Sequence, residues 1–294
     1  MAEANPSKLD RDILKMVLNL AGRKEVARLL YIHDEPLPPE ELRRRPIKRK
    51  LLFAVTSEQM VEELREKGFD AVLIPPYDYA RIERIKVAVV NGLTSGLLKE
   101  GQVILAATGL KKSLDTLIKL KIGSDFDERI SVDALDLSEE FHGQVIETLL
   151  DLALRIGHDG FEGHPVGTLL VVGDAVTVME KSRQLTINPF QGVSEAERNV
   201  LNPRIREAIR SFSILDGAFV VREDGVVMAA GRYLQAGTYN VDVPLGLGAR
   251  HTAAAAITKE TQSISITVSQ TSGTVRIFRD GHIALELHQP VRRT

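Results

Sequence analysis

The feature that most constrains the fold is the alternation of short apolar runs with helical patterns between residues 51 and 107. Runs at 51–55, 71–74 and 102–107 have the length of buried strands, and the segments between them show helical periodicity. Because parallel strands need crossover connections, this order predicts a parallel sheet with right-handed helical crossovers. The first part of the chain is therefore expected to be an α/β domain.

One amphipathic helix is predicted over residues 7–33, because apolar residues recur there at helical spacing. Gly22 is a point where this helix breaks or bends, and prolines at 36, 38 and 39 end the helical pattern. The basic run at 43–50 has no interleaved aromatic residues for base stacking. We interpret it as a solvated connector rather than a contact for nucleic acid.

Composition places the chain among ordinary globular proteins long enough for two domains. Its 294 residues are 44% hydrophobic and 27% charged, with a formal net charge of -2, so nothing attracts it globally to nucleic acid or membrane. The absence of cysteine excludes disulfides and thiolate metal sites. Without an apolar run of membrane-spanning length or a signal peptide at 1–12, a cytoplasmic protein is expected.

A domain boundary is expected between residues 123 and 138, where acidic residues dilute the apolar pattern. The resulting domains are 1–124 and 125–294. In the second domain, a helix is predicted to begin at Ser138 and to end with Gly157 as its C-cap. A strand at 168–172 should follow it.

Further local signals lie in the second domain. Ser194 with Glu197 has the spacing of a capping box, and Asn202-Pro203 is expected to start a helix. Hairpin turns are predicted at Asp224-Gly225 and Asp280-Gly281. These elements indicate a mixed sheet that helices cover.

The candidate functional residues lie between 214 and 269. Gly246 and Gly248 allow a close backbone approach to a ligand. Thr252 is expected to cap the alanine-rich helix that follows, whose N-terminus favours a phosphate. Arg250 can bind phosphate oxygens through two donors, and His251 can bind a metal or a phosphate.

Asp216-Gly217 interrupts an apolar run and supplies a carboxylate, the type of oxygen ligand that a divalent cation prefers. Taken alone, the same dipeptide favours an ordinary type I′ hairpin turn. The nucleotide site is favoured because the carboxylate, the glycine loop and the strand-end hydroxyl of Ser269 recur within one short region.

Asp216-Gly217-Ala218, followed by Gly248-x-Arg250-His251-Thr252, resembles the paired signature of the diadenylate cyclase (DAC) domain family. The resemblance covers roughly the C-terminal half and implies a DAC domain with a central mixed sheet flanked by helices. It implies a nucleotidyltransferase that joins two ATP molecules into the second messenger cyclic di-AMP and releases two pyrophosphates. Other agreeing features are Val172-Gly173-Asp174, Ser182-Arg183-Gln184-Leu185, Asn188-Pro189-Phe190, Ala229-Ala230-Gly231-Arg232-Tyr233-Leu234 and Val268-Ser269.

By this resemblance, Asp216, Arg250 and His251 are the catalytic residues, and Asp216 and His251 bind a divalent metal ion, Mn²⁺ or Mg²⁺. Leu234 would lie against the adenine and Ser269 would bind the triphosphate. Two such domains would meet face to face in a homo-oligomer, with ATP as substrate. The ATP-binding residues implied are Gly217, Ala218, Leu234, Gly248, Arg250, His251, Thr252 and Ser269.

The sequence departs from the family pattern at three positions. Thr252 stands where the motif often has a second Arg, as in archaeal-type members. Ala249 replaces a common Thr, and Gln270 replaces a common acidic residue. These two departures leave a second hypothesis open, a non-catalytic adenine-nucleotide sensor.

The N-terminal domain carries no recognisable phosphotransfer residues. Residues 85–109 weakly resemble the C-terminal domain of pyruvate kinase, in architecture only. The chain has no Walker A motif, and Gly246-x-Gly248 lacks the third glycine of a dinucleotide-binding loop. An oligomerisation or regulatory role is therefore expected for the N-terminal domain.

Overall fold

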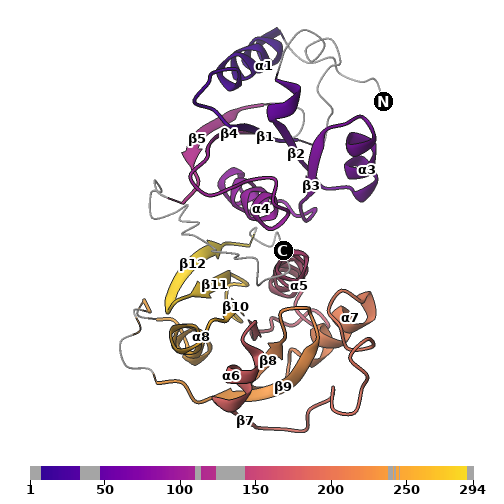
Figure 1. Ribbon diagram of the computed structural model, residues 1–294, viewed down its shortest axis with the longest axis vertical. Helices are drawn as coiled ribbons and strands as arrows, with labels where there is room; N and C mark the ends of the chain where they lie inside the picture. Colours follow the sequence, from indigo (N-terminus) through magenta and orange to yellow (C-terminus); the bar gives the residue numbers. More distant parts are fainter. Residues whose placement is uncertain are drawn as a thin grey trace. The chain divides into compact units, whose positions relative to one another are not determined.

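The computed structural model describes residues 8–33, 47–109, 114–123, 143–237, 241, 243–244 and 246–289. The chain divides into two compact units, Met1–Val132 and Asp133–Thr294, each built around its own sheet (Figure 1). The prolines at 36, 38 and 39 and the helix start predicted at Ser138 lie outside the described residues.

The first unit contains a five-stranded sheet in the order β3-β2-β1-β4-β5. The first four strands in this order are parallel, and β5 is an antiparallel edge strand next to β4. The predicted parallel α/β fold is therefore confirmed, and β5 is an addition to it. The strands are β1 (Arg28–Ile32), β2 (Leu51–Val55), β3 (Asp70–Leu73), β4 (Val103–Thr108) and β5 (Thr116–Lys121).

The prediction of a single helix over residues 7–33 is wrong, because the central strand β1 lies within this range. Helix α1 (Lys8–Ala21) ends before Gly22, and the chain then enters the sheet. Leu29, Leu30 and Ile32 are all 0% exposed, so this strand is covered on both faces. A short continuous apolar run of this kind cannot be told from a buried helix by periodicity.

Helices cover both faces of this sheet (Figure 1). Helix α1 and α3 (Glu58–Glu66) contribute to one hydrophobic core with β1 and β2, and α4 (Arg81–Thr94) contacts β1, β3 and β4. A 3-10 turn, η1 (Lys48–Lys50), leads into β2. Helix α4 ends at Thr94, and the turn that follows includes Gly96 with φ +71°.

The second unit contains a seven-stranded mixed sheet in the order β12-β11-β10-β6-β8-β9-β7. Only β6 and β8 pair in parallel within this sheet. Turns at Asp224-Gly225 and Asp280-Gly281 join β8 to β9 and β11 to β12, as predicted. The strands are β6 (Thr168–Val172), β7 (Ser182–Gln184), β8 (Ala218–Val221), β9 (Val227–Leu234), β10 (Ile264–Val268), β11 (Val275–Arg279) and β12 (His282–Leu287).

Helices α5 (Gly143–Asp159) and α8 (Ala249–Glu260) both contact β10, and the sheet passes between them in Figure 1. Two shorter helices, α6 (Ala175–Glu180) and α7 (Pro203–Phe212), complete the unit. The predicted start of α7 is confirmed, because Asn202 accepts a hydrogen bond from the Arg204 backbone at 3.0 Å.

Two local predictions in this unit are wrong. Helix α5 continues through Gly157 and ends before Gly160, which has φ +66°. Gly157 serves close packing instead, since a Cβ there would lie 2.3 Å from the Gly273 carbonyl oxygen. Ser194 does bond Glu197, at 2.5 Å, but the chain forms a turn there rather than a helix.

No helix in the part of the chain that the structure describes is both long enough and apolar enough to cross a membrane.

Candidate nucleotide-binding site

A cavity of about 510 Å³ lies where the start of α8, the end of β10 and the segment before β8 meet. It collects five of the predicted site residues, which come from three separate parts of the second unit. The residues that line it are Asp216, Gly246, Leu247, Gly248, Ala249, Arg250, His251, Val268, Ser269, Gln270, Thr271, Ser272 and Arg276.

Asp216 lies at the open side of this cavity, with 87% of its side chain exposed. The Asp216-Gly217 dipeptide connects α7 to β8, so it is not a hairpin turn. Gly217 has φ +97°, and a Cβ there would lie 2.7 Å from backbone atoms of Gly231 and Arg232. Only glycine fits this crossing, which leaves the Asp216 carboxylate facing solvent beside β8.

Arg250 lies opposite Asp216, and its Nη2 is 3.7 Å from Asp216 Oδ1. Its Nε is buried and has no hydrogen-bond partner among the described residues. The guanidinium lies over Gly167, where a Cβ would be 3.1 Å from Arg250 Nη1. Arg250 therefore presents unused donors between a carboxylate and a helix N-terminus, the arrangement that an anionic group needs.

Helix α8 begins at Ala249, and its N-cap is Gly248, four residues before the predicted cap Thr252. Backbone bonds from His251 N and Thr252 N to Gly248 O, at 3.0 and 3.4 Å, form the first turn. The cap prediction for Thr252 is wrong, because the helical turn already includes Arg250 and His251. The positive end of the helix dipole consequently lies at the cavity wall.

His251 forms the buried part of the cavity and is 6% exposed. Its Nε2 lies 3.2 Å from Arg276 Nη1, and Arg276 Nε donates to Glu286 Oε2 at 2.6 Å. Burial, followed by the positive charge of Arg276, lowers the pKa of His251 to about 4. His251 is therefore a neutral imidazole near pH 7.

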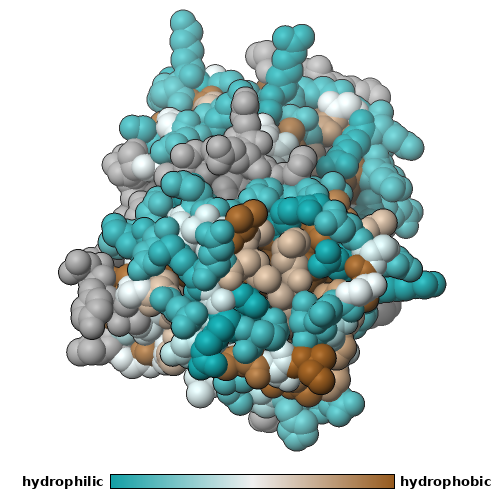
Figure 2. Space-filling model, turned by 60° about the horizontal axis from the view of Figure 1, so that its bottom comes forward, coloured by the Kyte–Doolittle hydropathy of each residue, from teal (hydrophilic) through white to brown (hydrophobic). Residues whose placement is uncertain are grey.

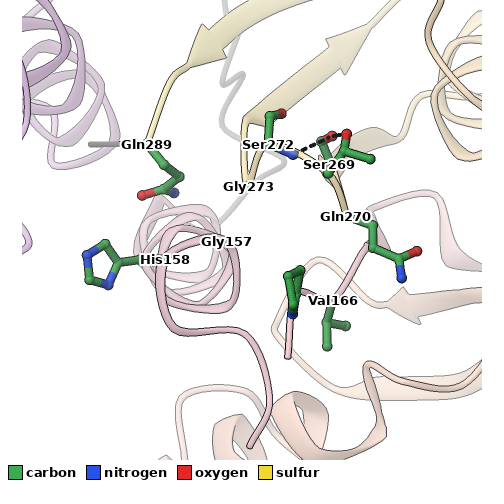
Figure 3. A pocket seen from close by; sticks show the side chains of 10 residues that line it. Gly157, His158, Val166, Ser269, Gln270, Ser272, Gly273 and Gln289 are labelled. Atoms are coloured by element: carbon green, nitrogen blue, oxygen red, sulfur yellow. Dashed lines mark hydrogen bonds between the residues drawn. The ribbon is translucent and has the colours of Figure 1, made fainter. Parts of the chain in front are cut away.

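The loop at 269–273 forms the remaining wall. Ser269 Oγ lies 3.2 Å from Thr271 Oγ1, and the Ser272 backbone donates to Ser269 Oγ at 3.5 Å. The same loop lines a second cavity of about 320 Å³, on the side of Gly157, His158 and Gln289 (Figure 3). Ser269 thus provides a hydroxyl at the end of β10 that borders both spaces.

Comparison with known proteins identifies the family of this chain. The family described as "DisA bacterial checkpoint controller nucleotide-binding" matches residues 155–283. A diadenylate cyclase of Methanocaldococcus jannaschii is 34% identical over 224 residues, which cover 75% of this chain and 71% of that protein. This chain belongs to the diadenylate cyclase family.

A second diadenylate cyclase, from Haloferax volcanii, is 34% identical over 206 residues, 70% of this chain and 75% of that protein. Among solved structures, DacA from Staphylococcus aureus is 21% identical, covers 49% of this chain and 86% of its own, and has a TM-score of 0.31. The predicted family is confirmed, and the relatives support cyclic di-AMP synthesis by a nucleotidyltransferase.

Four of the predicted ATP-binding residues lie outside the cavity lining. Gly217 and Ala218 follow Asp216 at the start of β8, and Leu234 ends β9 with its side chain in the core, 9% exposed. Thr252 lies in the first turn of α8 and does not line the cavity either. Their contacts with a nucleotide remain predictions.

Sequence reasoning missed Arg276 and Glu286, a cross-strand pair between β11 and β12. The available signal was a charged residue inside each of two apolar strands next to the Asp280-Gly281 turn. The diadenylate cyclase motifs do not include either position, so the resemblance gave no reason to select them.

Proposed function

We propose that the α8 cavity holds one ATP, with the triphosphate against Arg250, the N-terminus of α8 and Ser269. The observation that carries this proposal is the pairing of an exposed carboxylate, Asp216, with Arg250 across an open cavity. A cation and phosphate oxygens can both enter there, since the ion pair is long at 3.7 Å.

In the proposed reaction, the 3′-oxygen of each ATP attacks the α-phosphorus of the other. A new oxygen–phosphorus bond forms at each α-phosphate while the bond to pyrophosphate breaks, and each 3′-hydroxyl loses its proton. Asp216 accepts or directs that proton, because its carboxylate is the exposed base of the site. Arg250 and the α8 N–H groups stabilise charge on the phosphates.

A divalent ion, Mn²⁺ or Mg²⁺, fits Asp216 together with phosphate oxygens of the nucleotide. Among the described residues no three His, Asp or Glu side chains gather as a ready metal site, so the nucleotide supplies most ligands. His251 fits less well, because its Nε2 already lies 3.2 Å from Arg276. Such an ion would neutralise phosphate charge and acidify the attacking hydroxyl.

Two chains are needed for the product, because one site has parts for one ATP and cyclic di-AMP has two-fold symmetry. We place two second units face to face in a homo-oligomer, with equivalent patches in contact. Hydrophobic side chains suited to such contact are exposed, including Ile214 at 61% and Ile187 at 87%. Figure 2 shows hydrophobic residues gathered in patches between hydrophilic ones on one face.

The remaining assignments are parts of the same proposal. Leu234 lies against the adenine through its backbone, and Gly217 and Ala218 border the ribose beside Asp216. Residues 1–124 serve oligomerisation or regulation, and 125–294 form the DAC domain. With ATP as the substrate, the reaction belongs in the cytoplasm.

The test is incubation of the full chain with ATP and either Mn²⁺ or Mg²⁺, followed by chromatography of the products. Cyclic di-AMP and pyrophosphate in a 1:2 ratio are expected, as the reaction requires. Binding of ATP without any product in either metal would favour the nucleotide sensor instead. Asp216→Asn serves as the matched inactive control, because it keeps the side-chain shape.

A further inference from the structure

Two side chains that line the cavity, His251 and Arg276, continue into a row of four polar side chains that ends outside the lining. Glu286 and His288 come from β12 and the residues after it, Arg276 comes from β11, and His251 comes from α8. Glu286 Oε2 accepts from Arg276 Nε at 2.6 Å, and its Oε1 lies 3.0 Å from His288 Nε2. Arg276 Nη1 then reaches His251 Nε2 at 3.2 Å.

We propose that Arg276 and Glu286 are positioning residues of the cyclase, which hold His251 in one orientation and one tautomer and so fix the first turn of α8. This inference rests on the proposed function only in taking the α8 cavity as the nucleotide site. The contacts that carry it belong to the protein alone.

The chemistry of the guanidinium determines the tautomer of His251. Arginine has hydrogen-bond donors and no acceptor, so Nε2 of His251 must carry the lone pair at this contact. The proton of the neutral ring is then on Nδ1. The backbone of Gly248 favours the protonated form of this ring, as a carbonyl oxygen near a ring N–H does.

His251 lies in the first turn of α8, so its ring connects Arg276 to the point where the helix begins. Phe278 lies beside the imidazole, with ring centroids 6.2 Å apart, and limits its rotation. His251 is 6% exposed and Arg276 is 9% exposed, so water competes little for these contacts. Arg250 is the next residue and shares the same first turn.

This arrangement gives the adjacent residues Arg250 and His251 different roles. Nε2 of His251 is bonded to Arg276 within the protein, so at this nitrogen the ring orients the helix start rather than exchanging a proton with substrate. Arg250 lines the same cavity with 36% of its side chain exposed, so it is left to meet the phosphates. A buried arginine needs a bonded carboxylate, and Glu286 meets that need for Arg276.

The first measurement is the tautomer of His251 in the full-length protein. Histidine labelled with ¹⁵N gives long-range ring correlations that distinguish Nδ1–H from Nε2–H, and His251→Gln identifies the signal. The Nδ1–H form is expected at pH 7 without any nucleotide. An Nε2–H or a doubly protonated ring in the wild-type protein would overturn the proposal, whether or not the protein makes cyclic di-AMP.

The second measurement uses Arg276→Met, Arg276→Lys and Glu286→Gln. Arg276→Met removes the donor to Nε2, so the ring signals should change and kcat should fall by about ten- to a hundredfold, since small displacements of positioned groups have such effects. Arg276→Lys and Glu286→Gln keep part of the contact and should fall between. These milder variants keep the test valid if Arg276→Met does not fold.

Arg222→Met is the matched control. Arg222 also pairs with acidic side chains, Asp224 and Glu195, but lies at the other end of β8 from Asp216. It should leave the His251 ring signals and kcat unchanged within about twofold. Unchanged ring signals in Arg276→Met, or a rise in KM for ATP with unchanged kcat, would overturn the positioning role; the latter would make Arg276 a direct phosphate contact.

Discussion

The open side and the floor of the cavity differ sharply, although the sequence predicts a metal ligand in each. Asp216 has 87% of its side chain exposed, whereas His251 is 6% exposed and bonded to Arg276. An exposed carboxylate can exchange water for a cation or a substrate at little cost. A buried imidazole that is bonded to Arg276 must first break this contact, so its contribution is orientation.

The largest effect is expected from Asp216→Asn, which tests the open side. The amide keeps the shape but removes the charge that directs the cation and the 3′-hydroxyl proton. Turnover should fall by about a thousandfold or more, because such losses amount to several kcal/mol in the transition state. Initial rates of cyclic di-AMP formation provide the measurement, with circular dichroism as the check on folding; a near wild-type rate contradicts the role of Asp216.

A second prediction concerns whether the open sides of two chains must meet. Wild-type chains are mixed with a ninefold excess of Asp216→Asn chains and allowed to exchange. Most wild-type chains then face an inactive partner, so activity per wild-type chain should fall by about tenfold. Activity that stays proportional to the wild-type concentration, with exchange verified by labelled subunits, means that each chain works alone.

The third prediction separates Arg250 from its buried neighbour. Arg250→Ala deletes a charge-assisted contact to phosphate and should weaken binding of a non-hydrolysable ATP analogue by about ten- to a hundredfold. Arg250→Lys keeps the charge and should lose less. Isothermal titration measures both variants, and unchanged affinity in Arg250→Ala would remove Arg250 from the phosphate site.

The same contrast explains what the sequence could predict. Strands β2, β4 and β6 can be predicted because each is a bounded apolar run. The site residues of the open side fall within recognisable motifs. The sequence pattern predicts a helix where strand β1 lies, because the residues of β1 are buried on both faces. This burial removes the alternation of polar and apolar residues that marks a strand. Local composition therefore predicts the exposed site residues better than it predicts β1, the central strand of the first sheet.

The pairing of Arg276 with Glu286 at the floor of the cavity could not be predicted from the sequence, because a β-bulge determines this pairing. Pairing outward from the Asp280-Gly281 turn, Arg279 meets His282 and Phe278 meets Ile283, but the register then shifts and Ile277 meets Leu285. Without that shift Arg276 would face Leu285; with it, Arg276 faces Glu286. A bulge moves a side chain to a new partner without a change in composition.

The smallest expected effect is a change in the free energy of unfolding with pH. It tests only the buried floor of the cavity. Burial and the charge of Arg276 lower the pKa of His251 to about 4 in the folded chain, while Glu286 opposes this and Arg250 adds to it. In the unfolded chain the ring has its usual pKa of about 6.5. Acid therefore protonates the unfolded state first.

The stability that neutral His251 contributes is full above pH 6.5, falls as the pH drops toward 4, and then levels off. The loss is at most about 3 kcal/mol. Hydrogen exchange in α8 and β11 measures it locally, since two units need not unfold in one step. His251→Gln has no titrating ring, so its protection should decline less between pH 7 and 4.5 than that of the wild type. Equal declines in the two proteins would mean that the His251 ring is not held neutral in the folded chain. The distinction between an oriented floor and a reactive open side would then not hold for His251.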